Sequence, residues 1–291
     1  MRILVTGASG VIGSELTFQL KNSGHEVIGI SQTKSVEGIK TYRGSITDQV
    51  FLRSLIKDLE NIDAFVHLAA TKEDQQESKI FETNVYGTQL MIKTANELAS
   101  RQFIMVSGVS IFNSMGPDPI NEETPPCPKG PYLLTKYLSE QVLNLDTNFS
   151  GLKKIIRIPS PVGPTLKKGK IFREFIESAM ADRDLEIWGD GNRTQNYLDL
   201  RDFCDGFKLL LTYDSEGVWN IAGPREISDV QLAKKVIETT KSNSRIIVLN
   251  KPEVLSASMS AVSNEKIMRQ LNFKPKRSIE ETIRWIATGE Q

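Results

Sequence analysis

Tyr132 and Lys136 are the two residues of this sequence best suited to acid–base chemistry. They lie four apart in Tyr132–Leu145, which we predict to be a helix, so both side chains face the same way. A neighbouring ammonium stabilises a tyrosinate and lowers the pKa of a phenol from its usual value of about 10. The pair is therefore suited to taking a proton from a hydroxyl group or giving one to a ketone.

A second candidate group lies in residues 103–113, FIMVSGVSIFN, where Ser107, Gly108 and Ser110 end a predicted strand. Side chains alternate between the faces of a strand, so Ser110 shares the side of Gly108 if the chain stays extended, and Ser107 points the other way. Both serines are candidate catalytic residues. Gly108 either permits a turn or leaves a space that a water or a substrate group fills.

The stretch TGASGVIG follows the first predicted strand and leads into an amphipathic helix. Its three glycines allow a tight turn, close approach to a pyrophosphate and close packing of helix on strand, while helix N–H groups favour an anion. We predict dinucleotide contacts from Gly7, Ser9, Gly10, Val11, Ile12 and Gly13.

The second predicted strand ends in GISQTKS, where a carboxylate usually accepts a hydrogen bond from the 2′-hydroxyl of NAD. Ser31 occupies that place, and the nearest charge is Lys34, which suits a 2′-phosphate. The sequence therefore favours NADP(H), with NAD(H) as the alternative, and makes Ser31 and Lys34 candidate cofactor residues.

Short β-branched runs alternate with helical patterns along the chain, which is typical of an α/β fold with a buried parallel sheet. The strands and helices of such a fold would position the groups described above. The predicted strands are Ile3–Thr6, Glu26–Ser31, Lys40–Arg43, Ala64–Leu68, Phe103–Ser107 and Lys154–Arg157. Helices are predicted after the glycine turn and at Ile80–Ser100, Tyr132–Leu145, Phe172–Ala181, Asp229–Thr239 and Ile279–Ala287, with short apolar runs at Val218–Ala222 and Ile246–Leu249.

After Arg157, the stretch IPSPVGPTLKKGK is rich in Pro, Gly and Lys, which predicts a loop and excludes a central strand or helix. We place a lobe boundary there. Residues 1–160, with residues 197–222, are expected to form a Rossmann dinucleotide-binding domain with a doubly wound parallel sheet. Residues 161–291 are expected to form mainly a smaller C-terminal α+β substrate-binding lobe.

The composition excludes several classes of protein. Lys plus Arg and Asp plus Glu both total 36, so no net charge attracts nucleic acid or an anionic membrane. Two cysteines do not make a disulfide framework, and two histidines, His25 and His67, are too few and too poorly spaced for a metal site. No apolar run approaches membrane-spanning length, and we expect a cytoplasmic protein.

Six segments together resemble the extended short-chain dehydrogenase/reductases, the NAD(P)-dependent epimerase/dehydratase family that acts mostly on nucleotide sugars. In chain order they are TGASGVIG, VHLAAT, NVYGT, YLLTK, RIPSPVGP and IWGDGNRTQNYLDLRDF. The resemblance implies a Rossmann domain, a smaller substrate lobe, hydride transfer at a sugar carbon, a nucleotide-sugar substrate and a homodimer. It adds cofactor contacts from Ser45, Ile46, Leu68, Ala69, Ala70, Asn84, Tyr132, Lys136, Ile158 and Pro159, and substrate contacts from Thr71, Ser160, Arg193 and Gln195.

Four positions depart from the pattern of the family. Gly108 stands where the family has a serine or threonine, three residues before the Val of its Val-Tyr-Gly segment. Gln195 replaces the arginine that contacts the sugar diphosphate, with Arg193 two residues earlier. Ser160 replaces an asparagine, and Ser45 replaces an aspartate at the adenine. Losing the hydroxyl costs about a hundred- to a thousand-fold in turnover if nothing replaces it.

Three functions follow from these observations. The first is an NADPH-dependent reductase of a 4-keto nucleotide sugar, with Tyr132 as proton donor and Lys136 in support. The second is a 4-epimerase that retains NAD, or a 4,6-dehydratase, which is disfavoured because Val109-Ser110 lacks the acidic pair expected there. The third is a cofactor-binding protein with little or no catalysis, favoured by Gly108 and Gln195 and opposed by the intact Tyr132/Lys136 pair.

Overall fold

The computed structural model describes residues 1–72, 75–112, 118–249, 251 and 261–289, and its largest element is a seven-stranded parallel sheet. The strands are β1 (Arg2–Thr6), β2 (Glu26–Ser31), β3 (Lys40–Arg43), β4 (Ala64–His67), β5 (Gln102–Gly108), β6 (Leu152–Ile158) and β10 (Gly217–Asn220). Their order is β10-β6-β5-β4-β1-β2-β3, so the direction of winding reverses between β1 and β4. Such a switch point is where doubly wound folds bind ligands, at the carboxyl ends of the strands.

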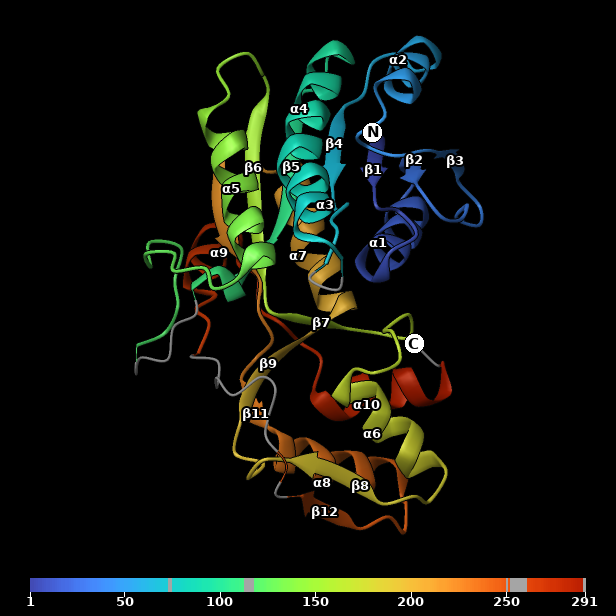
Figure 1. The fold of residues 1–291 in the computed structure, drawn as a ribbon, viewed down its shortest axis with the longest axis vertical. Helices are drawn as coiled ribbons and strands as arrows, with labels where there is room; N and C mark the ends of the chain where they lie inside the picture. The colour runs from blue at the N-terminus through green and yellow to red at the C-terminus, as the bar shows by residue number, and fades with distance from the viewer. Residues whose placement is uncertain (73–74, 113–117, 250, 252–260, 290–291) are drawn as a thin grey trace.

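Both faces of this sheet are buried, because the strands are apolar on both sides. On β1, Ile3 and Val5 enter one core and Leu4 enters the other. The first core includes side chains of α1 (Val11–Asn22), α7 (Leu200–Thr212) and α9 (Glu265–Leu271), and the second includes side chains of α2 (Gln49–Asp58), α4 (Gly87–Glu97) and α5 (Pro131–Leu145). The predicted Rossmann sheet is confirmed (Figure 1).

The helix predicted at Ile80–Ser100 is less regular than expected. It consists of α3 (Glu77–Phe81), a π-helical turn η1 (Glu82–Tyr86) and α4. A π turn places one extra residue in the helix and often marks a functional position. Here the turn contains Asn84, which is 1% exposed.

The smaller lobe lies below the large sheet in Figure 1. It has a three-stranded sheet of order β11-β9-β7, a two-stranded sheet β12-β8, and three helices over a common core. The elements are β7 (Ser160–Val162), α6 (Ile171–Met180), β8 (Leu185–Trp188), β9 (Thr194–Asp199), β11 (Glu226–Ser228), α8 (Asp229–Thr240), β12 (Ile246–Leu249) and α10 (Ile279–Thr288).

One detail differs from the sequence predictions for this region. Ser160–Val162, expected to be loop, forms β7, and Pro161 is tolerated because β7 is an edge strand. Within residues 197–222, which the sequence analysis assigned to the larger domain, α7 packs on the large sheet and β10 pairs with β6. The boundary near residue 160 stays a prediction. No helix of the described ranges is long and apolar enough to cross a bilayer.

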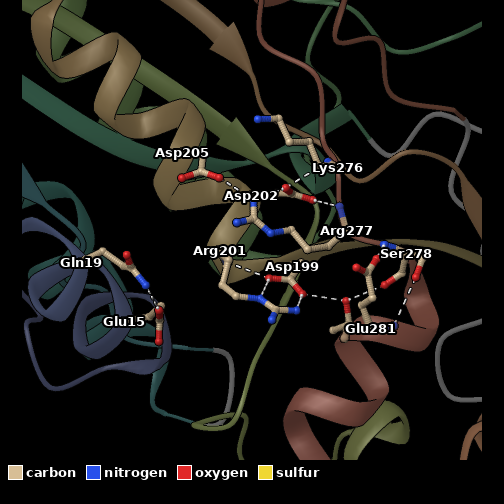
Figure 2. Close-up of polar contacts among 11 residues, drawn as sticks. Glu15, Gln19, Asp199, Arg201, Asp202, Asp205, Lys276, Arg277, Ser278 and Glu281 are labelled. Carbon is tan, nitrogen blue, oxygen red and sulfur yellow. Dashed lines mark hydrogen bonds and ion pairs between the residues drawn. The ribbon is translucent and has the colours of Figure 1, made fainter. Parts of the chain in front are cut away.

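A polar clasp ties α7 to the segment that precedes α10 (Figure 2). The carboxylate of Asp202 accepts hydrogen bonds from the backbone N–H groups of Lys276 and Arg277, each at 3.0 Å, and from the guanidinium of Arg277 at 2.7 Å. Asp199, the N-cap of α7, accepts from the hydroxyl of Thr282 at 2.7 Å. Carboxylates at a helix N-terminus are also favoured by the helix dipole.

Candidate active site

The predicted catalytic and cofactor residues gather along the carboxyl edge of the large sheet. Thr6, Ser31, His67, Gly108 and Ile158 end five of its strands, and Pro159 follows directly. The helix α5, which carries Tyr132 and Lys136, contacts both β5 and the 3-10 turn η2 (Val109–Phe112) that follows it. Groups from distant parts of the sequence therefore face one region.

The glycine turn after β1 leaves no room for a side chain at Gly7 or Gly13. Gly7 has φ +67°, and a β-carbon on it would lie 2.9 Å from the backbone nitrogen of Ala69. A β-carbon on Gly13 would lie 2.2 Å from the carbonyl oxygen of Gly7. The helix α1 begins at Val11 without a side-chain cap, so its first N–H groups remain suited to an anion. This turn fits the pyrophosphate of a dinucleotide cofactor.

A buried chain of hydrogen bonds fixes the loop after β4 against this turn. The hydroxyl of Thr6 accepts from the N–H groups of Leu68 and of the next residue, both at 3.2 Å, and contacts Nδ1 of His67 at 2.8 Å. Nε2 of His67 lies 3.1 Å from the hydroxyl of Thr88. Burial, and after it the charge of Lys136, lower the pKa of His67 to about 3, so this imidazole is neutral and positions the loop.

The side-chain amide of Asn84 joins the same loop to α5. Its oxygen accepts from the N–H of Thr71 at 2.7 Å, and its nitrogen donates to the carbonyl of Thr71 at 3.0 Å and to the hydroxyl of Thr135 at 2.9 Å. These three bonds occupy the amide within the protein. A direct contact of Asn84 or Thr71 with a ligand stays a prediction.

At the adenosine end of the predicted cofactor site, the hydroxyls of Ser9 and Ser31 lie 2.6 Å apart. The N–H of Lys34 lies 3.4 Å from the hydroxyl of Ser31. The hydroxyl of Ser45 is hydrogen-bonded to that of Thr47 at 2.9 Å, while Ile46 is buried in the core. The structure thus brings the hydroxyls of Ser9 and Ser31 and the backbone of Lys34 together at the end of β2, and their contact with a cofactor stays a prediction.

Lys136 extends from α5 to the end of β5. Its ammonium donates a hydrogen bond to the carbonyl of Val106 at 2.9 Å. Burial lowers the pKa of Lys136 to about 8, and the negative charge of Glu140, one turn further along α5, opposes this shift. The hydroxyl of Thr135 donates to the carbonyl of Tyr132 at 2.8 Å.

This pKa leads to a prediction about the pH dependence of turnover. The ammonium of Lys136 is present below pH 8 and is lost as the pH rises through about 8, because the pKa has moved down from 10.5. We expect kcat/KM to fall above that value, since kcat/KM reports the ionisation of the free enzyme. A pH profile with thermal unfolding followed in parallel checks this. A profile that stays flat well above pH 8 would contradict it.

Strand alternation does not place Ser110, because the chain does not stay extended after Gly108. It turns into η2 at Val109, yet the hydroxyl of Ser110 is 3.3 Å from the point where a β-carbon on Gly108 would lie. Within the described residues, the buried hydroxyl of Ser107 has no hydrogen-bond partner. Ser110 is exposed and is therefore the more accessible of the two serines.

Three predicted substrate residues meet in the smaller lobe. With its amide oriented to satisfy both neighbours, the oxygen of Gln195 accepts from the guanidinium of Arg193 at 2.8 and 2.9 Å, and its nitrogen lies 3.3 Å from the hydroxyl of Ser160. Arg193 also forms an ion pair with Asp229 at 3.1 Å, and both side chains are nearly buried. Asp229 thus neutralises the positive charge of Arg193, the residue predicted from the sequence to contact a sugar diphosphate.

Comparison with known proteins decides the family. The model of the NAD dependent epimerase/dehydratase family matches residues 3–222, which include the glycine turn, the Tyr132/Lys136 pair and β10. The chain belongs to this family. Members act on nucleotide sugars and use an NAD(P) cofactor.

The individual relatives are enzymes that catalyse different reactions. The chain is 29% identical over 314 residues to dTDP-D-glucose 4,6-dehydratase of Homo sapiens, covering 98% of this chain and 89% of the relative. It is 23% identical over 311 residues to dTDP-4-dehydro-6-deoxy-D-allose reductase of Streptomyces bikiniensis, covering 97% and 95%. The structure of UDP-glucose 4-epimerase from Thermotoga maritima superposes with a TM-score of 0.87 at 23% identity, covering 99% and 97%, which shows the shared fold.

One buried group of this epimerase/dehydratase family member was not predicted from its sequence. Arg157 of β6 forms an ion pair with Glu140 of α5 at 2.7 Å, and their side chains are 7% and 0% exposed. Arg157 also donates to the carbonyl of Glu122 at 3.1 Å. The spacing of Glu140, four residues after Lys136 on one helix, was the available signal. No group of three His, Cys, Asp or Glu in the described ranges could hold a metal ion.

Proposed function

We propose that this family member is an NADPH-dependent reductase of a 4-keto nucleotide sugar. The observation that carries the cofactor choice is the end of β2, where the hydroxyls of Ser9 and Ser31 and the chain of Lys34 meet without a carboxylate. A ribose 2′-hydroxyl would lack its usual acceptor there, whereas a 2′-phosphate is matched by hydroxyl donors and a cation. Consumption of NADPH fits net reduction.

In the proposed reaction, each residue at the carboxyl edge of the sheet has a separate role. When bound, NADPH supplies the hydride that converts the C4 carbonyl to an alcohol. Tyr132 donates its phenolic proton to the sugar oxygen as that oxygen gains charge, and solvent returns a proton to Tyr132. The ammonium of Lys136 stabilises the phenolate that remains. Buried His67, held neutral, fixes the loop beside the glycine turn.

The hydroxyl missing at Gly108 is supplied by Ser110 in this proposal, because its oxygen lies beside the vacant β-carbon position. Replacing Ser110 with Ala is expected to lower kcat by about a hundred- to a thousand-fold, the typical cost of one such donor. Gly108→Ser is expected to restore activity to the Ser110→Ala variant, because the new side chain reaches the same region.

Initial rates of the two single variants, the double variant and Ser107→Ala check this assignment. Ser107→Ala is the matched comparison, since it removes a hydroxyl from the same segment. A larger loss from Ser107→Ala than from Ser110→Ala would assign the role to Ser107 instead.

Hydride stoichiometry tests the proposed reaction. The purified protein is incubated with NADPH or NADH and a panel of nucleotide sugars and their 4-keto derivatives, and products are analysed. A reductase oxidises one NADPH for each product molecule. Product formation without net change in the nicotinamide absorbance would establish the alternative, a 4-epimerase that retains its cofactor. A 4,6-dehydratase is expected to have an acidic pair at positions 109 and 110. Val109 is buried and Ser110 has no carboxyl group, so these positions give no support to the dehydratase reaction.

A further inference from the structure

The strand β3 brings a second cation to the end of β2. The two strands pair in parallel, and Arg43, the last residue of β3, lies opposite Ser31, the last residue of β2. The next backbone N–H, that of Gly44, donates to the carbonyl of Ser31 at 3.1 Å. The ends of the two strands are therefore joined directly, although twelve positions separate Ser31 from Arg43 in the sequence.

Strand geometry places Arg43 on the face that holds the paired serine hydroxyls. Gly29 lies opposite Thr41, and a β-carbon on Gly29 would be 3.5 Å from the hydroxyl of Thr41 and 2.9 Å from the β-carbon of Ala8. This face is thus the one toward the glycine turn. Residues two apart on a strand share a face, so Arg43 and Ser31 lie on it as well.

The charges around this point are not balanced. Between Ser31 and Thr47 the sequence holds three cations, Lys34, Lys40 and Arg43, and one carboxylate, Glu37. Lys40 lies 4.6 Å from the centre of the Tyr42 ring, on the same strand. Lys34 and Arg43 are exposed, and neither forms an ion pair with any residue that the structure describes. Two exposed cationic residues without an ion pair in the described ranges thus lie next to Ser31, Lys34 through its backbone N–H and Arg43 through the strand register.

We propose that Arg43 binds the 2′-phosphate of NADP(H) together with Lys34, Ser9 and Ser31. A guanidinium can hold two phosphate oxygens at once, whereas an ammonium acts as a single point of charge, so Arg43 is the main determinant of cofactor choice. The assignment rests on the proposed NADPH dependence. It adds a residue on β3 that no pattern at the end of β2 reveals.

The test is a titration of purified Arg43→Ala with NADPH and with NADH. The dissociation constant for NADPH is expected to rise about 10- to 100-fold, the value of a charged hydrogen-bonded contact, while that for NADH changes less than about two-fold. The fragment 2′,5′-ADP is expected to lose affinity in parallel, and 5′-AMP is not. Arg53→Ala, an exposed arginine on α2, is the matched control and is expected to change neither constant.

The outcomes separate this inference from the proposed function. If the unaltered protein prefers NADPH and Arg43→Ala keeps that preference, the assignment of Arg43 is overturned and the reductase proposal stands. An equal rise in the dissociation constants of NADPH and NADH also overturns the assignment, because Arg43 would then not recognise the 2′-phosphate. If the unaltered protein binds NADH as tightly as NADPH, both the cofactor choice and the role of Arg43 are wrong.

Discussion

Tyr132→Phe is expected to lower kcat by about a hundred- to ten-thousand-fold, because it removes the one proton that the proposed reaction takes from the protein. The substitution deletes a single oxygen and leaves the ring in place. Its neighbour Lys136 keeps its hydrogen bond to Val106, so the helix and the strand end remain in position. Steady-state rates with a confirmed 4-keto substrate, together with the dissociation constant of NADPH, measure the effect.

Tyr213→Phe is the matched control for this experiment. Tyr213 lies just after α7, where its carbonyl accepts a hydrogen bond from Lys154, and Lys154 also contacts Gln102 at the first residue of β5. That places it at the opposite edge of the sheet from Tyr132. If Tyr132→Phe retained activity comparable to Tyr213→Phe, the enzymatic proposals would fail and a cofactor-binding protein without catalysis would be favoured.

Glu140→Gln is expected to lower the free energy of unfolding by about 3–5 kcal/mol, since it leaves the buried guanidinium of Arg157 without its counter-charge. The substitution is also expected to change the pKa of Lys136, the partner of Tyr132 in the proposed reaction. The charge of Glu140 raises the pKa of Lys136, so its removal moves that pKa below about 8 and shifts the fall in kcat/KM to lower pH. Urea unfolding and a pH profile of kcat/KM measure the two effects.

Glu97→Gln provides the comparison for Glu140. Glu97 pairs with Lys93 at 3.9 Å on the surface of α4, and exposed pairs of this kind contribute up to about 1 kcal/mol. An equal loss of stability in the two variants would show that burial adds nothing to the Glu140–Arg157 pair. A normal pH profile in Glu140→Gln would show that its charge does not act on Lys136.

Much of the larger domain could be predicted because its signals are local. The strands β2 and β3 begin and end at the predicted residues, since β-branched runs between turn residues mark a buried parallel strand. The strands β8, β9 and β11 of the smaller lobe were missed. They are short, and β9 includes polar residues such as Gln195 and Asn196, which pair with residues of β11.

The residues of the candidate site also fall into those that the sequence could predict and those that it could not. The motifs placed Tyr132, Lys136 and the glycine turn, because each depends on spacing within one element. The pairing of Arg193 with Asp229 joins residues 36 positions apart, so no spacing within one element reveals it. The contact between Ser110 and the position of Gly108 is local, but it depends on the turn at Val109 and not on the extended strand from which it was inferred. Roles for the individual site residues stay predictions until the variants are measured.

The clasp between α7 and the segment before α10 has a consequence for sequence variation. Asp202 holds the backbone N–H groups of Lys276 and Arg277 across 74 and 75 positions of sequence, so the shape of that segment is set mainly by a residue on another helix. Every residue except proline offers such an N–H. We therefore expect substitutions other than proline at position 276 to leave the loop in its conformation, whereas replacement of Asp202 removes the acceptor of both N–H groups.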